Sequence, residues 1–126
     1  MKRIITIALV FTAFVSTAQN KNWSEQMAAT VMNTWKDSFS LDDRPAKWTY
    51  DQGVILKGFE GIWLNTGDVK YYNYIQKSMD FFVKDDGSIK TYKQDEYNID
   101  NVNNGNLLLF LYRITQKEKY LKAAQL

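Results

Sequence analysis

The chain has 126 residues, with 16 Lys and Arg against 14 Asp and Glu, and it contains neither His nor Cys. That composition excludes Ser-His and Cys-His nucleophiles and the usual structural zinc sites. No clustered basic face for nucleic acid is indicated, and we expect no metal or cofactor. Any chemistry would fall to carboxylates, Tyr, Lys or Arg. The abundant aromatic residues suit either a carbohydrate-like ligand or a helical core.

Residues 1–18 have the pattern of a signal peptide. Two basic residues precede an apolar run over 4–15, and the small residues 16–18 fit a cleavage site. The run is shorter than the roughly 20 residues that a membrane-spanning helix needs. We therefore expect cleavage after Ala18 and a secreted or periplasmic protein with no membrane contact; an uncleaved anchor is the alternative. Cleavage leaves a chain of zero formal charge.

The segment Trp23–Trp35 is predicted to be an amphipathic helix. Asn22, with Glu25 three positions later, resembles a capping box at its start. Apolar residues recur every four positions and should form one stripe: Trp23, Met27, Val31 and Trp35. A polar linker, Lys36–Lys47, follows and holds the only Pro.

A second helix is predicted over Tyr50–Asn65, with Ile55, Phe59 and Ile62 on one face and Trp63 beside them. Three glycines interrupt this helix: Gly53, Gly58 and Gly61. Each costs about 1 kcal/mol relative to Ala inside a helix. Three such costs predict that the helix backbone closely approaches a neighbour or a ligand.

The tripeptide Thr66-Gly67-Asp68 is predicted to separate this helix from the next. Gly67 suits a left-handed helix end and Asp68 suits the N-cap of a third helix, which extends to about Val83. Its apolar positions recur at three- and four-residue steps: Tyr72, Ile75, Met79 and Phe82.

A turn is predicted at Lys84–Gly87 and a short strand at Ser88–Tyr92. The stretch Asp85-Asp86-Gly87-Ser88 lacks the alternating ligands of a calcium-binding EF-hand loop, so we interpret it as a turn.

A fourth helix is predicted from about Asn103, and a fifth from Gln116. The fourth is apolar on every side over Leu107–Tyr112 and should be buried on most sides. Thr115 with Glu118 forms a second capping box before the fifth.

The chain repeats itself at an offset of 49 residues, since Trp63–Ile75 resembles Tyr112–Ala124. In each segment an apolar helix, a turn with Thr and a helix with Tyr follow one another, which predicts stacked antiparallel αα-hairpins. The last helix reaches Leu126 without a C-cap. We therefore expect the N-terminal piece of a longer protein; a complete domain of about 108 residues is the alternative.

The segment Glu96–Asn106 combines five asparagines with two acids directly before the apolar helix. Two interpretations remain open from the residues alone. Asp100, Asn101 or Asn103 could cap the free N–H groups of the helix, or the cluster could form the floor of a binding site.

Three motifs resemble a known family: Trp48-x-Tyr50-x-x-Gly53, Thr66-Gly67-Asp68-x-x-Tyr71 and Tyr97-Asn98-x-Asp100-x-x-x-x-Gly105. In this order they resemble the unsaturated rhamnogalacturonyl hydrolases, glycoside hydrolase family 105, which are related to the unsaturated glucuronyl hydrolases of family 88. The resemblance covers Lys47–Leu126.

The resemblance implies an all-α fold in which residues 19–126 form αα-hairpins of the N-terminal part of an (α/α)6 toroid with an acidic pocket. It implies a hydrolase that removes a terminal unsaturated uronic acid from pectin-derived oligosaccharides. In this reaction an Asp protonates C4 of the sugar and assists addition of water at C5, and the resulting hemiketal collapses.

The resemblance also implies site residues. Asp100 matches an acid of the pocket and Tyr50 an aromatic ligand contact, with Trp48 and Asn98 as further substrate-binding residues. The main acid/base Asp is expected beyond Leu126, so the chain alone should be inactive. Two alternatives are a helical-repeat binding module without catalysis and an unsaturated glucuronyl hydrolase acting on glycosaminoglycan fragments.

Overall fold

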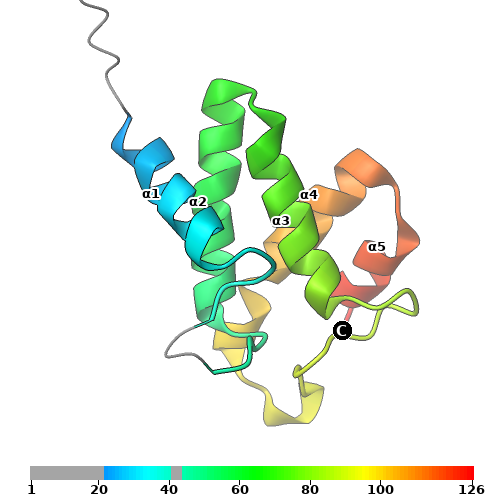
Figure 1. Cartoon of the computed structure of the whole chain (residues 1–126). Helices are drawn as coiled ribbons and strands as arrows, with labels where there is room; N and C mark the ends of the chain where they lie inside the picture. The colour runs from blue at the N-terminus through cyan, green and yellow to red at the C-terminus, as the bar shows by residue number, and fades with distance from the viewer. Residues whose placement is uncertain (1–21, 41–43) are drawn as a thin grey trace, which may run out of the picture.

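The computed structural model of the protein describes residues 22–40 and 44–126 (Figure 1). Within these ranges the regular elements are helical: α1 Trp23–Thr34, α2 Tyr50–Thr66, α3 Val69–Phe82, α4 Gly105–Thr115 and α5 Glu118–Ala124, with the 3₁₀ turns η1 Gln94–Glu96 and η2 Ile99–Val102. The predicted signal peptide lies outside the described residues. No helix of the described part is long and apolar enough to cross a membrane.

The helices form two αα-hairpins with one further helix at the side. α2 pairs with α3 and α4 pairs with α5, and α2 also contacts α1 and α4 (Figure 1). The two hairpins therefore stack through α2, α3 and α4. The predicted strand at Ser88–Tyr92 is reduced to a single antiparallel bridge between Val83 and Ile89.

The repeat predicted at an offset of 49 residues is confirmed, because the two hairpin turns make equivalent hydrogen bonds. Thr66 and Thr115 each donate an O–H to the carbonyl four residues earlier, at 2.8 Å in both cases. Each also accepts the N–H two residues later, at 3.2 and 3.3 Å. The residue after each Thr is left-handed, with φ of 69° at Gly67 and 56° at Gln116.

The two hairpins begin their second helices differently. Asp68 accepts the N–H of Lys70 at 3.0 Å, which confirms it as the N-cap of α3. The capping box predicted from Thr115 and Glu118 is wrong. α5 begins at Glu118 after Lys117, which makes no side-chain cap, because Thr115 is the last residue of α4.

The geometry shared by the two repeats extends to two buried tyrosines, and each is hydrogen-bonded to an acid on the helix that precedes its hairpin. Tyr71 is 1% exposed and its O–H lies 3.4 Å from Glu25 of α1. Tyr120 is fully buried and donates to Asp80 of α3 at 2.6 Å. Each hairpin is thus connected to the helix before it, α1 or α3.

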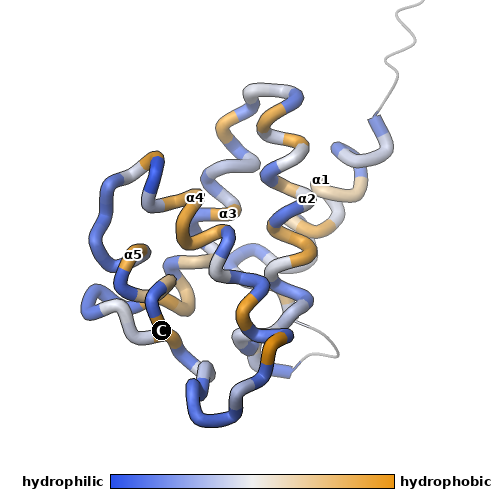
Figure 2. Tube along the Cα trace, turned by 180° about the vertical axis from the view of Figure 1, so that it is seen from behind, coloured by the Kyte–Doolittle hydropathy of each residue, from blue (hydrophilic) through white to orange (hydrophobic). Residues whose placement is uncertain are grey.

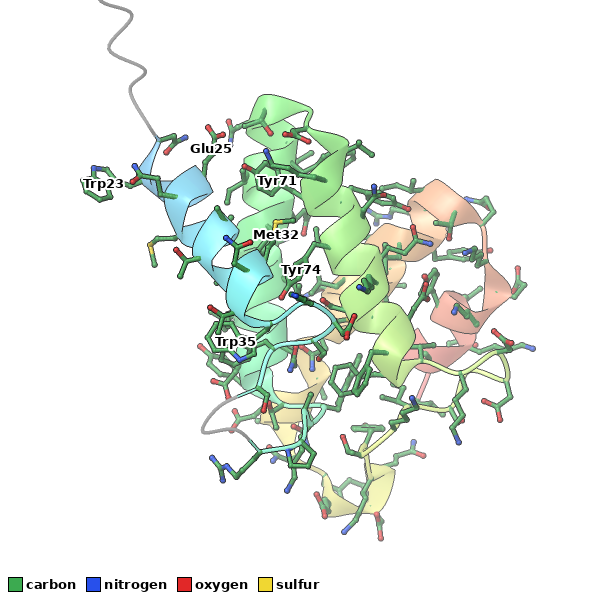
Figure 3. The ribbon with its side chains drawn as sticks, in the orientation of Figure 1. Trp23, Glu25, Met32, Trp35, Tyr71 and Tyr74 are labelled. Carbon is green, nitrogen blue, oxygen red and sulfur yellow. The ribbon has the colours of Figure 1, made fainter. Side chains whose placement is uncertain are left out.

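The apolar stripe predicted for α1 is wrong at its N-terminal end. Trp23 and Met27 are 79% and 70% exposed, and Figure 3 shows Trp23 pointing away from the other helices. The side that packs on the core holds Ala28, with Val31 and Met32 partly buried. A helix has 3.6 residues per turn, so positions spaced four apart drift steadily around it and leave the buried face.

α4 is apolar along most of its length, as Figure 2 shows, but it is not buried all round. Leu107, Leu108 and Leu111 are at most 1% exposed, whereas Leu109 is 41% exposed. Phe110 and Tyr112 are partly buried against the core, so the prediction of burial on most sides is confirmed over Leu107–Tyr112 except at Leu109, and α4 contacts α2, α3 and α5.

Candidate functional site

The N-terminal end of α2 lies against the polar loop that precedes α4. η2 packs on α2, so residues about 50 positions apart in the chain lie side by side there (Figure 1). This is the region in which the sequence predicts the site residues Trp48, Tyr50, Asn98 and Asp100.

Trp48 holds three segments together from inside the protein. Its ring is 3% exposed and packs edge-on against Phe82, with 5.6 Å between ring centroids. Its backbone N–H donates to Thr91 Oγ1 at 2.8 Å, and its indole Nε1–H donates to the carbonyl of Asn101 at 3.0 Å. A ring buried in this way offers little face to a sugar. In this structure Trp48 supports η2, and its predicted contact with substrate gains no support.

Asn104 joins the start of α4 to the start of α2. Its side chain is fully buried and donates from Nδ2 to the carbonyl of Thr49 at 3.0 Å. Thr49 is the N-cap of α2 and Asn104 is the N-cap of α4. The N-terminal ends of the two helices are therefore connected by one side-chain hydrogen bond.

The prediction that the backbone of α2 closely approaches a neighbour at its glycines is confirmed at Gly53, whereas Gly58 and Gly61 meet no neighbour among the described residues. A Cβ at Gly53 would lie 2.5 Å from Asn103 Nδ2 and 2.6 Å from Asn104 Oδ1. A Cβ at Gly58 or Gly61 would meet no atom of the described residues within 4 Å. Only Gly53 faces the loop before α4.

Asn98 and Asp100 lie at the start of η2. Asn98 Oδ1 accepts the N–H of Asp100 at 3.0 Å, so Asn98 caps this 3₁₀ turn. Asp100 is exposed to solvent. Asp100 does not cap α4, whose N-cap, Asn104, makes no side-chain cap hydrogen bond. The helix-cap interpretation of Asp100 is therefore not what the structure shows.

Tyr50 is the first residue of α2 and is 51% exposed. The structure thus leaves two of the four predicted site side chains, Tyr50 and Asp100, open to a ligand on adjacent segments. Asn98 is also exposed, but its side-chain oxygen is occupied by the cap of η2.

Sequence reasoning missed the buried polar residues beneath this region. Gln52 is 1% exposed and donates from Nε2 to the carbonyl of Phe39. The sequence pattern shows Asn104 only as one member of an asparagine-rich loop. The one signal for its burial was its place immediately before Gly105 and the apolar run, at the boundary of α4.

Carboxylates are spread along the chain. No group of three or more Asp or Glu in the described ranges is close enough to hold a metal ion. The turn at Asp85–Ser88 is a turn as predicted, and the Asp86 carboxylate accepts the backbone N–H of Ser88 at 2.8 Å. Hydrogen bonding from Ser88 lowers the pKa of Asp86.

Comparisons with known proteins agree with this architecture. The family model described as Glycosyl Hydrolase Family 88 matches residues 23–126. A solved glycoside hydrolase from family 105, of C. acetobutylicum ATCC 824, is 40% identical with a TM-score of 0.68. The match covers 81% of this chain and 27% of that chain. The chain thus spans about a quarter of the solved relative and corresponds to part of its (α/α)6 toroid. This chain belongs to the glycoside hydrolase family 88, in the group that also includes family 105.

Proposed function

We propose that the complete protein carrying this chain removes a terminal unsaturated uronic acid from rhamnogalacturonan oligosaccharides by hydrating the C4–C5 double bond. The observation that carries the proposal is the pairing of Tyr50 and Asp100. Both are exposed, both occupy motif positions of the family resemblance, and they lie on α2 and η2, which pack together.

In this proposal Asp100 is a supporting acid that holds the sugar through its hydroxyl groups, and the exposed ring of Tyr50 lies against the sugar. A carboxylate beside an anionic uronate is unfavourable unless other charge compensates. The N-terminal ends of α2 and α4 meet at this point through the Asn104 to Thr49 hydrogen bond. Helix N-termini carry partial positive charge, which favours an anionic ligand.

The chemical step itself would use an Asp elsewhere in the complete protein. That Asp in its acid form donates a proton to C4, and water adds at C5 while the resulting carboxylate takes up the proton of the water. The product is a hemiketal at C5, which collapses and releases the remaining oligosaccharide. One carboxyl group whose pKa suits both proton transfers can perform them.

Export is a further part of the proposal. The signal-peptide pattern of residues 1–18 supports a secreted or periplasmic location, where pectin-derived oligosaccharides would be met.

The test uses the complete protein and follows the loss of ultraviolet absorbance of the double bond. We expect turnover of unsaturated rhamnogalacturonan disaccharide in preference to an unsaturated glucuronyl disaccharide from a glycosaminoglycan. Asp100→Asn should lower turnover at least tenfold, about 1.4 kcal/mol, as expected for one lost hydrogen bond to a charged group. Its stability should change by well under 1 kcal/mol, because Asn is nearly isosteric and the backbone N–H of Asp100 keeps its bond to Asn98.

Asp95→Asn is the matched control, since Asp95 is another exposed acid of the same loop, in η1. It should leave turnover unchanged. If only the glycosaminoglycan disaccharide is turned over, the substrate is an unsaturated glucuronyl sugar and the proposed rhamnogalacturonan substrate is wrong. No turnover of either sugar, together with binding of a protein partner, would favour the repeat-module interpretation.

A further inference from the structure

We infer that the contact between Gly53 and Asn104 positions Asp100 relative to Tyr50. This contact is called the Gly53–Asn104 contact below. The inference rests on the proposed function for its catalytic consequence, and on the packing of α2 against the loop before α4 for its geometry.

The contact is close enough to fix the two segments. A Cβ added at Gly53 would lie 2.6 Å from Asn104 Oδ1 and 2.5 Å from Asn103 Nδ2. Real Cβ atoms essentially never show such distances, so a side chain at position 53 forces both amides, or α2 itself, to move. Asn103 is only partly buried and has room to turn. Asn104 is fully buried and held by Thr49.

The buried amide of Asn104 is costly, which argues against a role in stability alone. Its Oδ1 is buried without a hydrogen-bond partner in the described part of the chain. A buried polar atom left unpaired costs on the order of a hydrogen bond, and an apolar residue of the same shape would avoid that cost. The hydrogen bond that offsets this cost is the one that Asn104 Nδ2 donates to the carbonyl of Thr49 at 3.0 Å.

The contact acts on the site through very short segments of backbone. Thr49 is adjacent to Tyr50 in the chain. On the other side, Asn104 lies four residues after Asp100, and η2 between them is held by Trp48 through the Asn101 carbonyl. A shift of Asn104 away from α2 therefore moves the Asp100 segment while Tyr50 stays with α2. Gly53 and Asn104 are positioning residues, because neither is exposed to a substrate.

The experiment compares Gly53→Ala with Gly58→Ala in the complete protein. Gly58 lies in the same helix with no atom of the described residues within 4 Å of a Cβ, so Ala there reports the effect of helix propensity alone. Two readouts are needed: kcat and KM on the unsaturated disaccharide, and hydrogen exchange of peptides covering residues 98–107.

We expect Gly53→Ala to lower kcat at least tenfold with a smaller change in KM, and to speed hydrogen exchange over residues 98–107. Gly58→Ala should leave kcat, KM and exchange in that segment unchanged. A Gly53→Ala protein with normal kcat and normal exchange overturns the inference. A lower melting temperature with normal kcat per folded molecule also overturns it.

Asn104→Ala provides a second measurement if Gly53→Ala fails to fold. It removes the hydrogen bond to Thr49 without adding volume, and the same fall in kcat and the same faster exchange are expected. Normal kcat and exchange in this variant contradict the inference. If the wild-type protein shows no turnover, the proposed function fails, and the exchange difference between Gly53→Ala and Gly58→Ala alone decides whether the Gly53–Asn104 contact orders the loop.

Discussion

The hairpin α2–α3 and the hairpin α4–α5 build the same turn from different residues. Both use a Thr that bonds to the carbonyl four residues earlier and a left-handed residue after it. The first hairpin places Gly67 and Asp68 in the turn, which suit the left-handed position and the N-cap. The second places Gln116 and Lys117 at the same positions.

The Thr hydrogen bonds and the packing of the helices therefore set this turn, and the best turn residues are not required. A left-handed conformation costs roughly 1 kcal/mol or more for a residue with a Cβ. Gln116 partly offsets that cost, since its Nε2 donates to the carbonyls of Tyr112 and Arg113 at 3.2 and 3.1 Å. The second turn is therefore the less favourable one locally.

The two hairpins also differ in the hydrogen bonds that their tyrosines make to the preceding helix, α1 or α3. Tyr120 donates to Asp80 at 2.6 Å, and Lys119 reaches the same carboxylate at 2.7 Å. Tyr71 lies 3.4 Å from Glu25, at the limit of a hydrogen bond. The second hairpin thus compensates for its poorer turn by a stronger connection to α3.

The largest expected effect is the loss of that connection. Tyr120→Phe removes a hydrogen bond to a charged group, and such bonds contribute roughly 1.5–3 kcal/mol to stability. The expected loss is about 1.5 kcal/mol, the low end of that range, because Asp80 is partly exposed. Tyr71→Phe should cost under about 0.5 kcal/mol, because its hydrogen bond is long. Urea unfolding of the complete protein measures both. Equal costs would show that the two tyrosine contacts are equivalent.

A second prediction concerns alkaline pH and a residue that only the first hairpin has. Burial raises the pKa of Tyr74 from 10.0 to about 12, while its counterpart at an offset of 49 residues is Ala123. A raised pKa means that the neutral phenol stabilises the fold fully below about pH 10, and that this stability is lost as the pH rises toward 12.

The unfolding free energy of the wild-type protein should therefore fall between pH 10 and 12 more steeply than that of Tyr74→Phe. Burial also raises the pKa of Tyr120, so Tyr120→Phe should flatten the profile further when combined with Tyr74→Phe. Identical pH profiles for wild type and the double variant contradict the prediction.

The third prediction has the smallest effect and places an Asp in the second hairpin turn at the position that Asp68 occupies in the first. Lys117 has φ −78° and ψ 114°, close to φ −74° and ψ 110° at Asp68. Lys117→Asp should therefore cap α5 through the N–H of Lys119 and stabilise the protein by about 0.5–1 kcal/mol. Lys117→Ala is the control, since it removes the Lys without adding an acceptor. A higher melting temperature in both variants would show that removal of Lys, not capping, is responsible.

The sequence predicted the parts of the fold that depend on residues close together in the chain. Gly67 and Asp68 are adjacent and determine their turn locally, and the offset of 49 residues needed no knowledge of packing. The capping box at Thr115 failed because the same residue pattern also fits the end of the preceding helix. The exposure of Trp23 depends on how α1 is rotated against its neighbours, which no local pattern determines.

The site was predicted in the same uneven way. Stacked hairpins place equivalent positions side by side, and η2, which contains Asp100, packs on α2, which begins with Tyr50. Glycine spacing indicated a close approach without showing which of three glycines makes it. Gly53 is buried and faces Asn103 and Asn104, whereas Gly58 is exposed and Gly61 half-buried, and these are properties of the tertiary structure.

Gly87 carries a consequence for the order of events during synthesis. It is left-handed, with φ of 90°, and a Cβ there would lie 2.5 Å from Cβ of Lys122. The turn after α3 therefore rests on a residue that the ribosome adds 35 positions later. At about 5–20 residues per second that is a delay of roughly 2–7 s. Lys122 leaves the ribosome after Gly87 by the same delay, so α2 and α3 can pair while the surface at Gly87 still lacks its contact with α5.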